Sequence, residues 1–231
     1  EYSLRITAKS LAEVVDLPPE IENSRDRGRL GVLIEKYFFK HTPPNDHNPD
    51  FAEAGLELKV TGVVKAKNGS YRAKERLVLT MINFEELVHE SWDRSTLLTK
   101  CKKMLIMFYQ FDSEVPVINR KFVLNSILYE IPDEDLPIIR QDWLAIQRKV
   151  QLGRAHELSE GDTFYLGACR KGAGGAKEAL RKQPFSEIGA PARAFSFKQG
   201  YLNRLISDLQ NEATLKIAPE KTIEVATQER F

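Results

Sequence analysis

The sequence contains few cysteines, no long apolar run and almost no excess of charge of one sign. Its 231 residues include two cysteines, Cys101 and Cys169, which are too few for a disulfide framework and do not have zinc-ligand spacing. No apolar stretch approaches the roughly 20 residues of a membrane-spanning helix, and the chain does not open on a charged segment followed by an apolar signal core. These absences argue against a disulfide-rich secreted module and an integral membrane protein, and we expect a reducing cytoplasm.

Length and composition are those of a globular protein with a sizeable core. Hydrophobic residues make up 42% and charged residues 29% of the chain, as in ordinary globular domains. A chain of 231 residues suffices for one large domain or for two lobes that share a cleft. Because the first residue is Glu1 rather than Met, we expect a piece of a longer protein.

Positive charge is concentrated in residues 165–205. This segment holds eight basic residues against two acidic ones, a net charge of +6, although the whole chain carries only +1. It also contains Gly172, Gly174 and Gly175. A basic, glycine-containing segment is typical of a phosphate-binding arm, but a solvated positive face is the commoner meaning of such a cluster. Charge alone leaves both interpretations open.

Apolar spacing and turn residues indicate an alternation of helices and strands. A Ser-x-x-Glu capping box predicts a short helix at 10–13, and apolar residues at helical spacing predict an amphipathic helix over 30–38. The order of elements indicates an α/β domain with a mixed sheet. The remaining predictions are strands at 56–64, 76–84, 104–110 and 122–130, a turn at 67–70, helices at 135–153, 175–183 and 199–211, and loop elsewhere.

The stretch HNPDFAEAGLELKVTG, at 47–62, combines charged residues with strand alternation. Alternate side chains of a strand share one face, so Glu57 and Lys59 are expected side by side, on the face opposite Leu58. If the start of the strand passes close to the preceding loop, Asp50 reaches the same place. The alternation therefore predicts two carboxylates and a lysine at one point.

This grouping matches what metal-dependent phosphodiester hydrolysis requires. Asp50, Glu57 and the main-chain carbonyl of Leu58 offer the hard oxygen ligands that Mg²⁺ prefers. Next to a metal, Lys59 would orient an attacking water and balance charge on the scissile phosphate. The spacing is not specific, because a pattern of this kind is expected roughly twice by chance in such a chain. An exposed strand with Glu57 and Lys59 as solvated neighbours is the alternative.

Longer passages of the sequence resemble a known family. The passages GVLIEKYFF and PDFAEAGLELKVT, followed in order by SYRAKERLVLTMINFE, GRAHELSEGDTFYL, KGAG and RAFSFKQGY, resemble the MutH-like and Sau-type GATC-specific endonucleases of the PD-(D/E)XK superfamily. The resemblance covers most of the chain. It implies a restriction-endonuclease-like α/β fold, in which helices flank a mixed β-sheet and two lobes surround a DNA cleft.

The same resemblance implies a domain organisation. One MutH-like nuclease domain would span residues 1–231, with a catalytic lobe at 20–130 and DNA-reading segments at 160–205. Residues 217–231 would lead into a C-terminal MutH-like domain that is absent from this sequence.

The family pattern also assigns catalytic roles. Asp50 and Glu57 match its metal ligands, and Lys59 matches its motif lysine. Glu35 matches an additional helix glutamate beside the metal site, although a glutamate on a helix surface would look the same in the sequence.

A second catalytic lysine is expected from a strand beside the metal site. Lys100 matches that position, and a small shift of alignment would give the role to Lys102 or Lys103. A lysine that snorkels at the start of a strand is the plain alternative.

The basic segment would contain the residues that read the DNA. Arg170 and Lys171 are candidates for guanine or phosphate contacts, and Gly172 for close approach of the backbone. The repair enzymes of the family have a tyrosine, linked to sensing adenine methylation, where this chain has a serine, which argues for tolerance of the methyl group. A second contact segment would contain Arg193, Ser196 and Lys198.

Together, the resemblance implies a type II restriction endonuclease domain that cleaves double-stranded DNA at GATC and leaves 5′-phosphate overhangs. Mg²⁺ would be the cofactor, with Mn²⁺ as a substitute, and the protein would lie in a bacterial cytoplasm and dimerise on DNA. One alternative is a MutH-like enzyme that nicks one strand at GATC during mismatch repair. The other is a GATC-binding allosteric module without catalytic activity.

Overall fold

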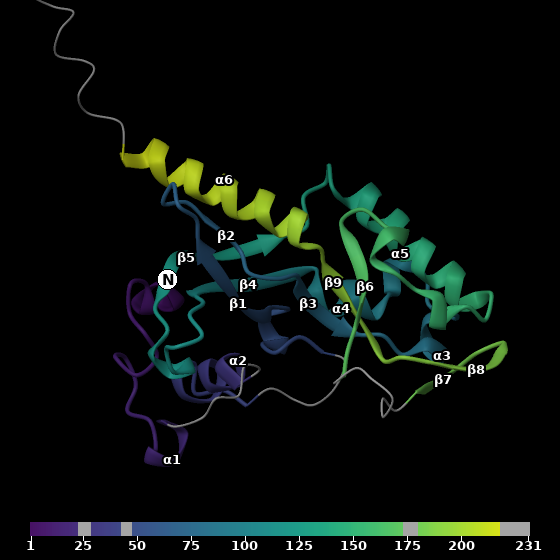
Figure 1. The fold of residues 1–231 in the computed structure, drawn as a ribbon, viewed down its shortest axis with the longest axis horizontal. Helices are drawn as coiled ribbons and strands as arrows, with labels where there is room; N and C mark the ends of the chain where they lie inside the picture. Colours follow the sequence, from purple (N-terminus) through teal and green to yellow (C-terminus); the bar gives the residue numbers. More distant parts are fainter. Residues whose placement is uncertain (23–28, 43–47, 173–179, 218–231) are drawn as a thin grey trace, which may run out of the picture.

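A mixed four-stranded sheet carries the charged stretch at its centre (Figure 1). The computed structural model describes residues 1–22, 29–42, 48–172 and 180–217. The strand order is β2-β1-β4-β5, in which β1 runs parallel to β4 and antiparallel to β2, and β5 runs antiparallel to β4. The strands are β1 (Glu57–Lys65), β2 (Tyr71–Ala73), β4 (Lys103–Gln110) and β5 (Phe122–Glu130).

A second, antiparallel sheet of three strands lies beside the first. Its order is β3-β9-β6, so that β9 is hydrogen-bonded on both edges. A separate hairpin pairs β7 with β8. The strands are β3 (Leu77–Met81), β6 (Leu166–Arg170), β7 (Arg181–Gln183), β8 (Ser186–Ala190) and β9 (Arg193–Phe197).

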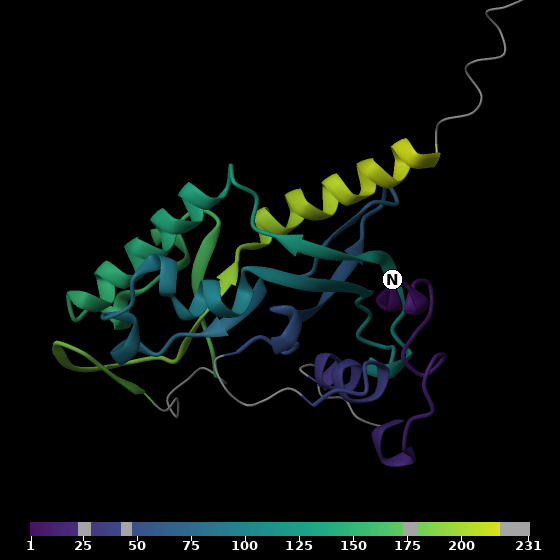
Figure 2. The same cartoon turned by 180° about the vertical axis from the view of Figure 1, so that it is seen from behind.

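Helices lie on two sides of the sheets. Figures 1 and 2 show α5 and α6 along one side of the molecule and α2 on the other. The helix α2 continues directly into a π-helical turn at Ile34–Phe38. The α-helices are α1 (Pro19–Glu22), α2 (Arg29–Leu33), α3 (Phe84–Leu87), α4 (Thr96–Cys101), α5 (Leu136–Gln151) and α6 (Gln199–Ile217). Within the described residues, none of the helices has the length and apolar character that crossing a bilayer would need.

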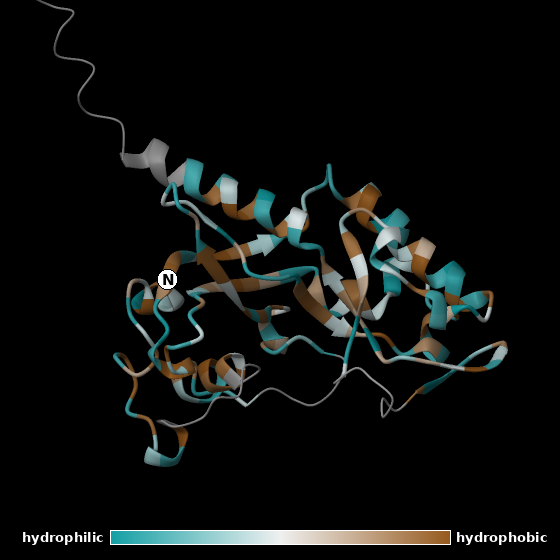
Figure 3. Ribbon diagram, viewed as in Figure 1, coloured by the Kyte–Doolittle hydropathy of each residue, from teal (hydrophilic) through white to brown (hydrophobic). Residues whose placement is uncertain are grey.

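The mixed sheet separates two hydrophobic cores, because its central strand β4 is apolar on both faces. Met104, Ile106 and Phe108 face a large core shared with the second sheet and α5. Met107 and Tyr109, on the other face, pack in a smaller core with α2 and the N-terminal segment. Figure 3 shows the corresponding apolar colouring along the strands of both sheets.

Most of the predicted elements are confirmed. The strands at 56–64, 76–84, 104–110 and 122–130 and the helices at 30–38, 135–153 and 199–211 correspond to β1, β3, β4, β5, α2 with its π-helical turn, α5 and α6. The mixed sheet flanked by helices is also confirmed.

Three predictions about local structure are wrong. Residues 10–13 form turns instead of a helix, although the Ser10 N–H does donate to Glu13 Oε2 at 2.6 Å, as in a capping box. The basic helix predicted at 175–183 is wrong over residues 181–183, which form strand β7, and its first part, 175–179, lies outside the described residues. The regions at 166–170 and 193–197, which were expected to be loop, form β6 and β9.

Candidate active site

A tight reversal places Asp50 beside the start of β1. The Phe51 N–H donates to the Leu56 carbonyl at 2.9 Å, and the Leu56 N–H donates back to the Phe51 carbonyl at 3.2 Å. Gly55 closes this reversal with a φ of 59°, a left-handed conformation that glycine adopts without strain. The sequence separation of seven residues between Asp50 and Glu57 therefore becomes a direct contact.

Main-chain hydrogen bonds fix the two carboxylates. The Asp50 N–H donates to Glu57 Oε2 at 3.1 Å, and the Leu58 N–H donates to Asp50 Oδ2 at 2.9 Å. Asp50 is 9% exposed and Glu57 is 2% exposed. Because each carboxylate is held by the backbone of the segment that carries the other, the pair is rigidly placed before any ligand binds.

Two lysines complete the cluster. Lys59 Nζ lies 2.6 Å from Glu57 Oε1, and Lys100 Nζ lies 3.8 Å from the same oxygen. Burial raises the pKa of Glu57, while the charge of Lys59 opposes that rise. Burial lowers the pKa of Lys59, but the neighbouring Cys101 and Glu57 outweigh burial and raise it. The Lys59 ammonium is therefore charged at neutral pH.

Lys100 comes from a helix and not from a strand as predicted. It lies in the last turn of α4, immediately before β4. Lys102 is exposed, and Lys103 pairs with Glu130 at 3.6 Å. Of the three lysines that the sequence left as alternatives, Lys100 is the one at the cluster.

Glu35 lies on the π-helical turn, and its side chain interacts electrostatically with the carboxylates of Asp50 and Glu57. Burial, and then the neighbouring Asp50 and Glu57, raise the pKa of Glu35 to about 7. His41 links this turn to the cluster. Its main-chain N–H donates to the Glu35 carbonyl at 2.9 Å, and its ring Nε2 lies 2.6 Å from the Asp50 carbonyl oxygen. Three acidic side chains thus share one partly buried region, which favours a bound cation.

The cluster fits a divalent metal ion whose coordination is completed from outside the protein. In the described part of the chain, no group of three or more His, Cys, Asp or Glu side chains has the arrangement of a fully protein-made metal site. Mg²⁺ is commonly held by one or two carboxylates, with waters and substrate phosphates as its other ligands. Asp50 and Glu57 supply that number of carboxylates, and the Leu58 carbonyl stays the predicted third protein ligand.

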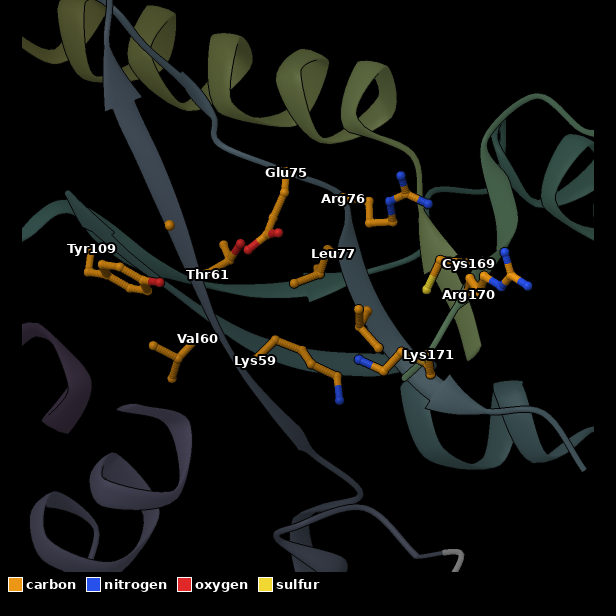
Figure 4. A pocket seen from close by; sticks show the side chains of 12 residues that line it. Lys59, Val60, Thr61, Glu75, Arg76, Leu77, Tyr109, Cys169, Arg170 and Lys171 are labelled. Atoms are coloured by element: carbon orange, nitrogen blue, oxygen red, sulfur yellow. The ribbon is translucent and has the colours of Figure 1, made fainter. Parts of the chain in front are cut away.

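A pocket of about 550 Å³ opens next to Lys59, between β1 and the second sheet. Figure 4 shows Lys59 and Lys171 extending into it from opposite walls. Its other charged lining residues are Glu75, Arg76 and Arg170. The pocket therefore joins the charged cluster to the basic segment, as a cleft that accommodates a phosphodiester backbone would.

Three of the predicted DNA-reading residues lie at the end of β6 beside this pocket. Arg170 is exposed, Lys171 is half-buried, and Gly172 has a φ of 122°. The Lys171 N–H donates to the Ala192 carbonyl at 2.8 Å, which holds the backbone here while its side chain extends into the pocket.

The other three predicted DNA contacts are engaged within the protein itself. Ser196 is fully buried, and Arg193 is buried with its guanidinium donating to the carbonyls of Ala168 and Leu158. Lys198 donates to the carbonyls of Glu160 and Thr163. The physical reason for the burial of Arg193 and Ser196 is that β9 is the central strand of its sheet and is buried on both faces. The Arg193 guanidinium satisfies main-chain carbonyls there, as buried polar groups usually do.

The sequence did not single out Thr61 and Arg76, which also line the pocket. The period-two alternation that places Glu57 and Lys59 on one face extends to Thr61, so that residue was within reach of sequence reasoning. Arg76 lies just before β3 and reaches the pocket only through the contact between the two sheets.

Comparison with known proteins agrees with this geometry. Residues 39–142, which contain the charged cluster, match the family model described as DNA mismatch repair enzyme MutH. The type II restriction enzyme Sau3AI of Staphylococcus aureus is 41% identical over 184 residues, which are 79% of this chain and 37% of that protein. The chain belongs to the MutH-like family.

Repair proteins of the MutH-like family match over a shorter region. MutH of Shewanella woodyi is 30% identical over 149 residues, which are 64% of this chain and 62% of that protein, and MutH of Pasteurella multocida is 24% identical over 149 residues, or 64% of each chain. The chain thus spans about two fifths of the restriction enzyme and less than two thirds of these repair proteins. Membership of the MutH-like family carries the PD-(D/E)XK nuclease fold.

Proposed function

We propose that this chain is the catalytic part of a type II restriction endonuclease that hydrolyses double-stranded DNA at GATC in the presence of Mg²⁺. The observation that carries the proposal is the contact of Asp50, Glu57 and Lys59 at the edge of a basic pocket. The chain is 41% identical to an enzyme named as a type II restriction enzyme, which supports this function over others of the fold.

The residues of the cluster have distinct roles in the proposed reaction. Asp50 and Glu57 would hold the metal ion, which stabilises negative charge on the phosphate and makes bound water more acidic. Lys59, fixed 2.6 Å from Glu57, would orient the attacking water and balance charge on the scissile phosphate. Lys100 would add a second positive charge beside Glu57. Cleavage ahead of the guanine would leave 5′-phosphate overhangs.

Sequence recognition would come from the other wall of the pocket. Arg170 and Lys171 supply donors that suit guanine O6 and N7 or phosphate oxygens, and Gly172 permits close approach of the backbone. The hydrogen bonds of Arg193 and Lys198 to main-chain carbonyls support a further role for these two residues, which is to fix the strand and loops behind the reading segment. Ser196 is fully buried in the same strand as Arg193.

A strand-specific nicking enzyme of mismatch repair is the second candidate function. The match of residues 39–142 to the MutH family model favours it. Against it, Ser196 is buried, so this position does not present a side chain that senses adenine methylation at the DNA surface.

The proposal includes partners and a location. A C-terminal MutH-like domain of the same protein would assist DNA binding, and two copies would meet on DNA. The proposed location is the cytoplasm of a bacterium, which agrees with the free, buried thiols of Cys101 and Cys169.

The test is cleavage of a duplex that contains a single GATC, with unmodified, hemimethylated and fully methylated versions as parallel substrates. Double-strand breaks in all three, dependent on Mg²⁺, are expected. Nicking confined to unmethylated strands would support the repair function instead. Binding without cleavage, unchanged by Lys59→Ala, would contradict both enzyme functions and support an allosteric DNA-binding module.

A further inference from the structure

Arg76 lines the pocket, and its guanidinium already forms an ion pair with a carboxylate. Its guanidinium Nη1 pairs with Glu160 Oε1, and both side chains are partly exposed, at 41% and 42%. In Figure 4 the head group of Arg76 points away from Lys59 and Lys171, although all three residues line the pocket. The ion pair thus draws one of the pocket's positive charges toward its rim.

Three independent contacts hold Glu160 in this position. Its carboxylate pairs with Arg76, and its carbonyl accepts a hydrogen bond from Lys198 Nζ. The third contact is with Gly167 of β6, where a side-chain Cβ would lie 3.2 Å from Glu160 Oε2. The glycine at 167 therefore lets the Glu160 carboxylate lie close against β6, where a larger residue would displace it slightly.

Glu160 and a DNA phosphate would compete for the same group. A guanidinium binds carboxylate and phosphate oxygens in the same planar geometry. The other charged residues that line the pocket are the basic Lys59, Arg170 and Lys171 and the acidic Glu75. A polyanion entering this pocket meets an arginine whose present partner carries the same sign of charge as the polyanion.

We infer that Arg76 is a further DNA-backbone-binding residue of the cleft and that Glu160 withholds it until DNA arrives. The inference rests on the proposed function, because it takes duplex DNA as the ligand of the pocket. On binding, the Arg76 guanidinium exchanges the Glu160 carboxylate for a phosphate oxygen. Glu160 therefore lowers DNA affinity without contacting a base, and its effect is independent of sequence.

The test is a salt titration of DNA binding with Ca²⁺ in place of Mg²⁺, using a GATC duplex and a duplex without the site. Glu160→Gln keeps the shape that packs on Gly167 and is expected to bind both duplexes roughly two- to five-fold tighter at low salt, the range of an exposed ion pair. Arg76→Gln is expected to bind both more weakly, with a salt slope reduced by about 0.9, as for one lost phosphate contact. In the Arg76→Gln background, Glu160→Gln should bring little further gain.

Glu157→Gln is the matched control. Glu157 pairs with Arg154 at 2.5 Å and has a similar exposure, 41%, but it does not line the pocket. The Glu157→Gln substitution removes the same charge as Glu160→Gln and should leave DNA binding nearly unchanged. A Glu160→Gln variant that behaves like this control, or whose gain persists fully without Arg76, would overturn the inference while leaving the proposed function intact. Wild-type protein that does not bind duplex DNA would overturn both.

Discussion

Lys59 Nζ lies 2.6 Å from Glu57 Oε1, two residues away on the same face of β1. The carboxylate is almost fully buried, and its other oxygen accepts the Asp50 N–H. Lys59 thus compensates a buried charge in the metal-free protein. In the proposed function it has a second role, which is to balance charge on the scissile phosphate. These two uses lead to separate predictions.

Replacing Lys59 should destabilise the metal-free protein in a pH-dependent way. Lys59→Met removes the charge that opposes the burial-driven rise of the Glu57 pKa, so that pKa rises further. A carboxyl whose folded pKa lies above its unfolded value loses stability as pH rises from the unfolded pKa through the folded one. We expect a loss of about 3 kcal/mol in the free energy of unfolding at pH 8 and a much smaller loss near pH 4, measured by urea unfolding with a chelator. Equal losses at both pH values would contradict this explanation, and adding Glu57→Gln should restore stability at pH 8.

Replacing Glu35 should stabilise the metal-free protein, the opposite of the effect expected for Lys59→Met. Its pKa of about 7 in the folded protein lies above the ordinary 4.5, so deprotonation costs stability over that interval. Glu35→Gln should therefore unfold at a higher temperature than wild type at pH 8 without metal, and at the same temperature below pH 4.5. With Mg²⁺ present the advantage should shrink, because a cation favours the ionised wild-type carboxylate. A variant that is less stable at pH 8 in chelator would show that Glu35 makes a stabilising interaction when charged.

Comparing Lys100 with its neighbour Lys102 distinguishes a specific role in the cluster from a general effect of nearby positive charge. Lys100 reaches Glu57 at 3.8 Å, whereas Lys102 is exposed. Lys100→Ala should lower the single-turnover cleavage rate by roughly 10- to 100-fold, somewhat less than the loss of a direct transition-state donor, and Lys102→Ala should leave it within about two-fold. Similar losses in both variants would assign the effect to general electrostatic attraction of DNA.

Strand alternation and the family resemblance were sufficient to predict the central sheet and the cluster. The pattern around Leu58 placed Glu57 and Lys59 on one face, and the structure adds the Phe51–Leu56 reversal that brings Asp50 to them. The position of Lys100 at the end of α4 was not predictable from alternation, because it depends on where the helix ends and β4 begins.

The second sheet was the harder part to predict. In β9 every residue is buried, including Arg193 and Ser196. A strand covered on both faces lacks the alternation that identifies a strand with one exposed face, so its polar residues looked like surface contacts. The Arg76–Glu160 pair joins residues 84 positions apart, and no local pattern encodes such a contact.

The most direct test of the central claim compares two lysines of the same strand. Single-turnover cleavage of a GATC duplex in Mg²⁺ would be measured for wild type, Lys59→Ala and Lys65→Ala, with DNA binding measured in Ca²⁺. Lys65 is exposed near the far end of β1 and serves as the matched control. We predict a loss of roughly 100-fold or more in the cleavage rate of Lys59→Ala with nearly unchanged DNA binding, and a rate close to wild type for Lys65→Ala. Cleavage by Lys59→Ala at the wild-type rate would contradict the assignment of this cluster as the active site.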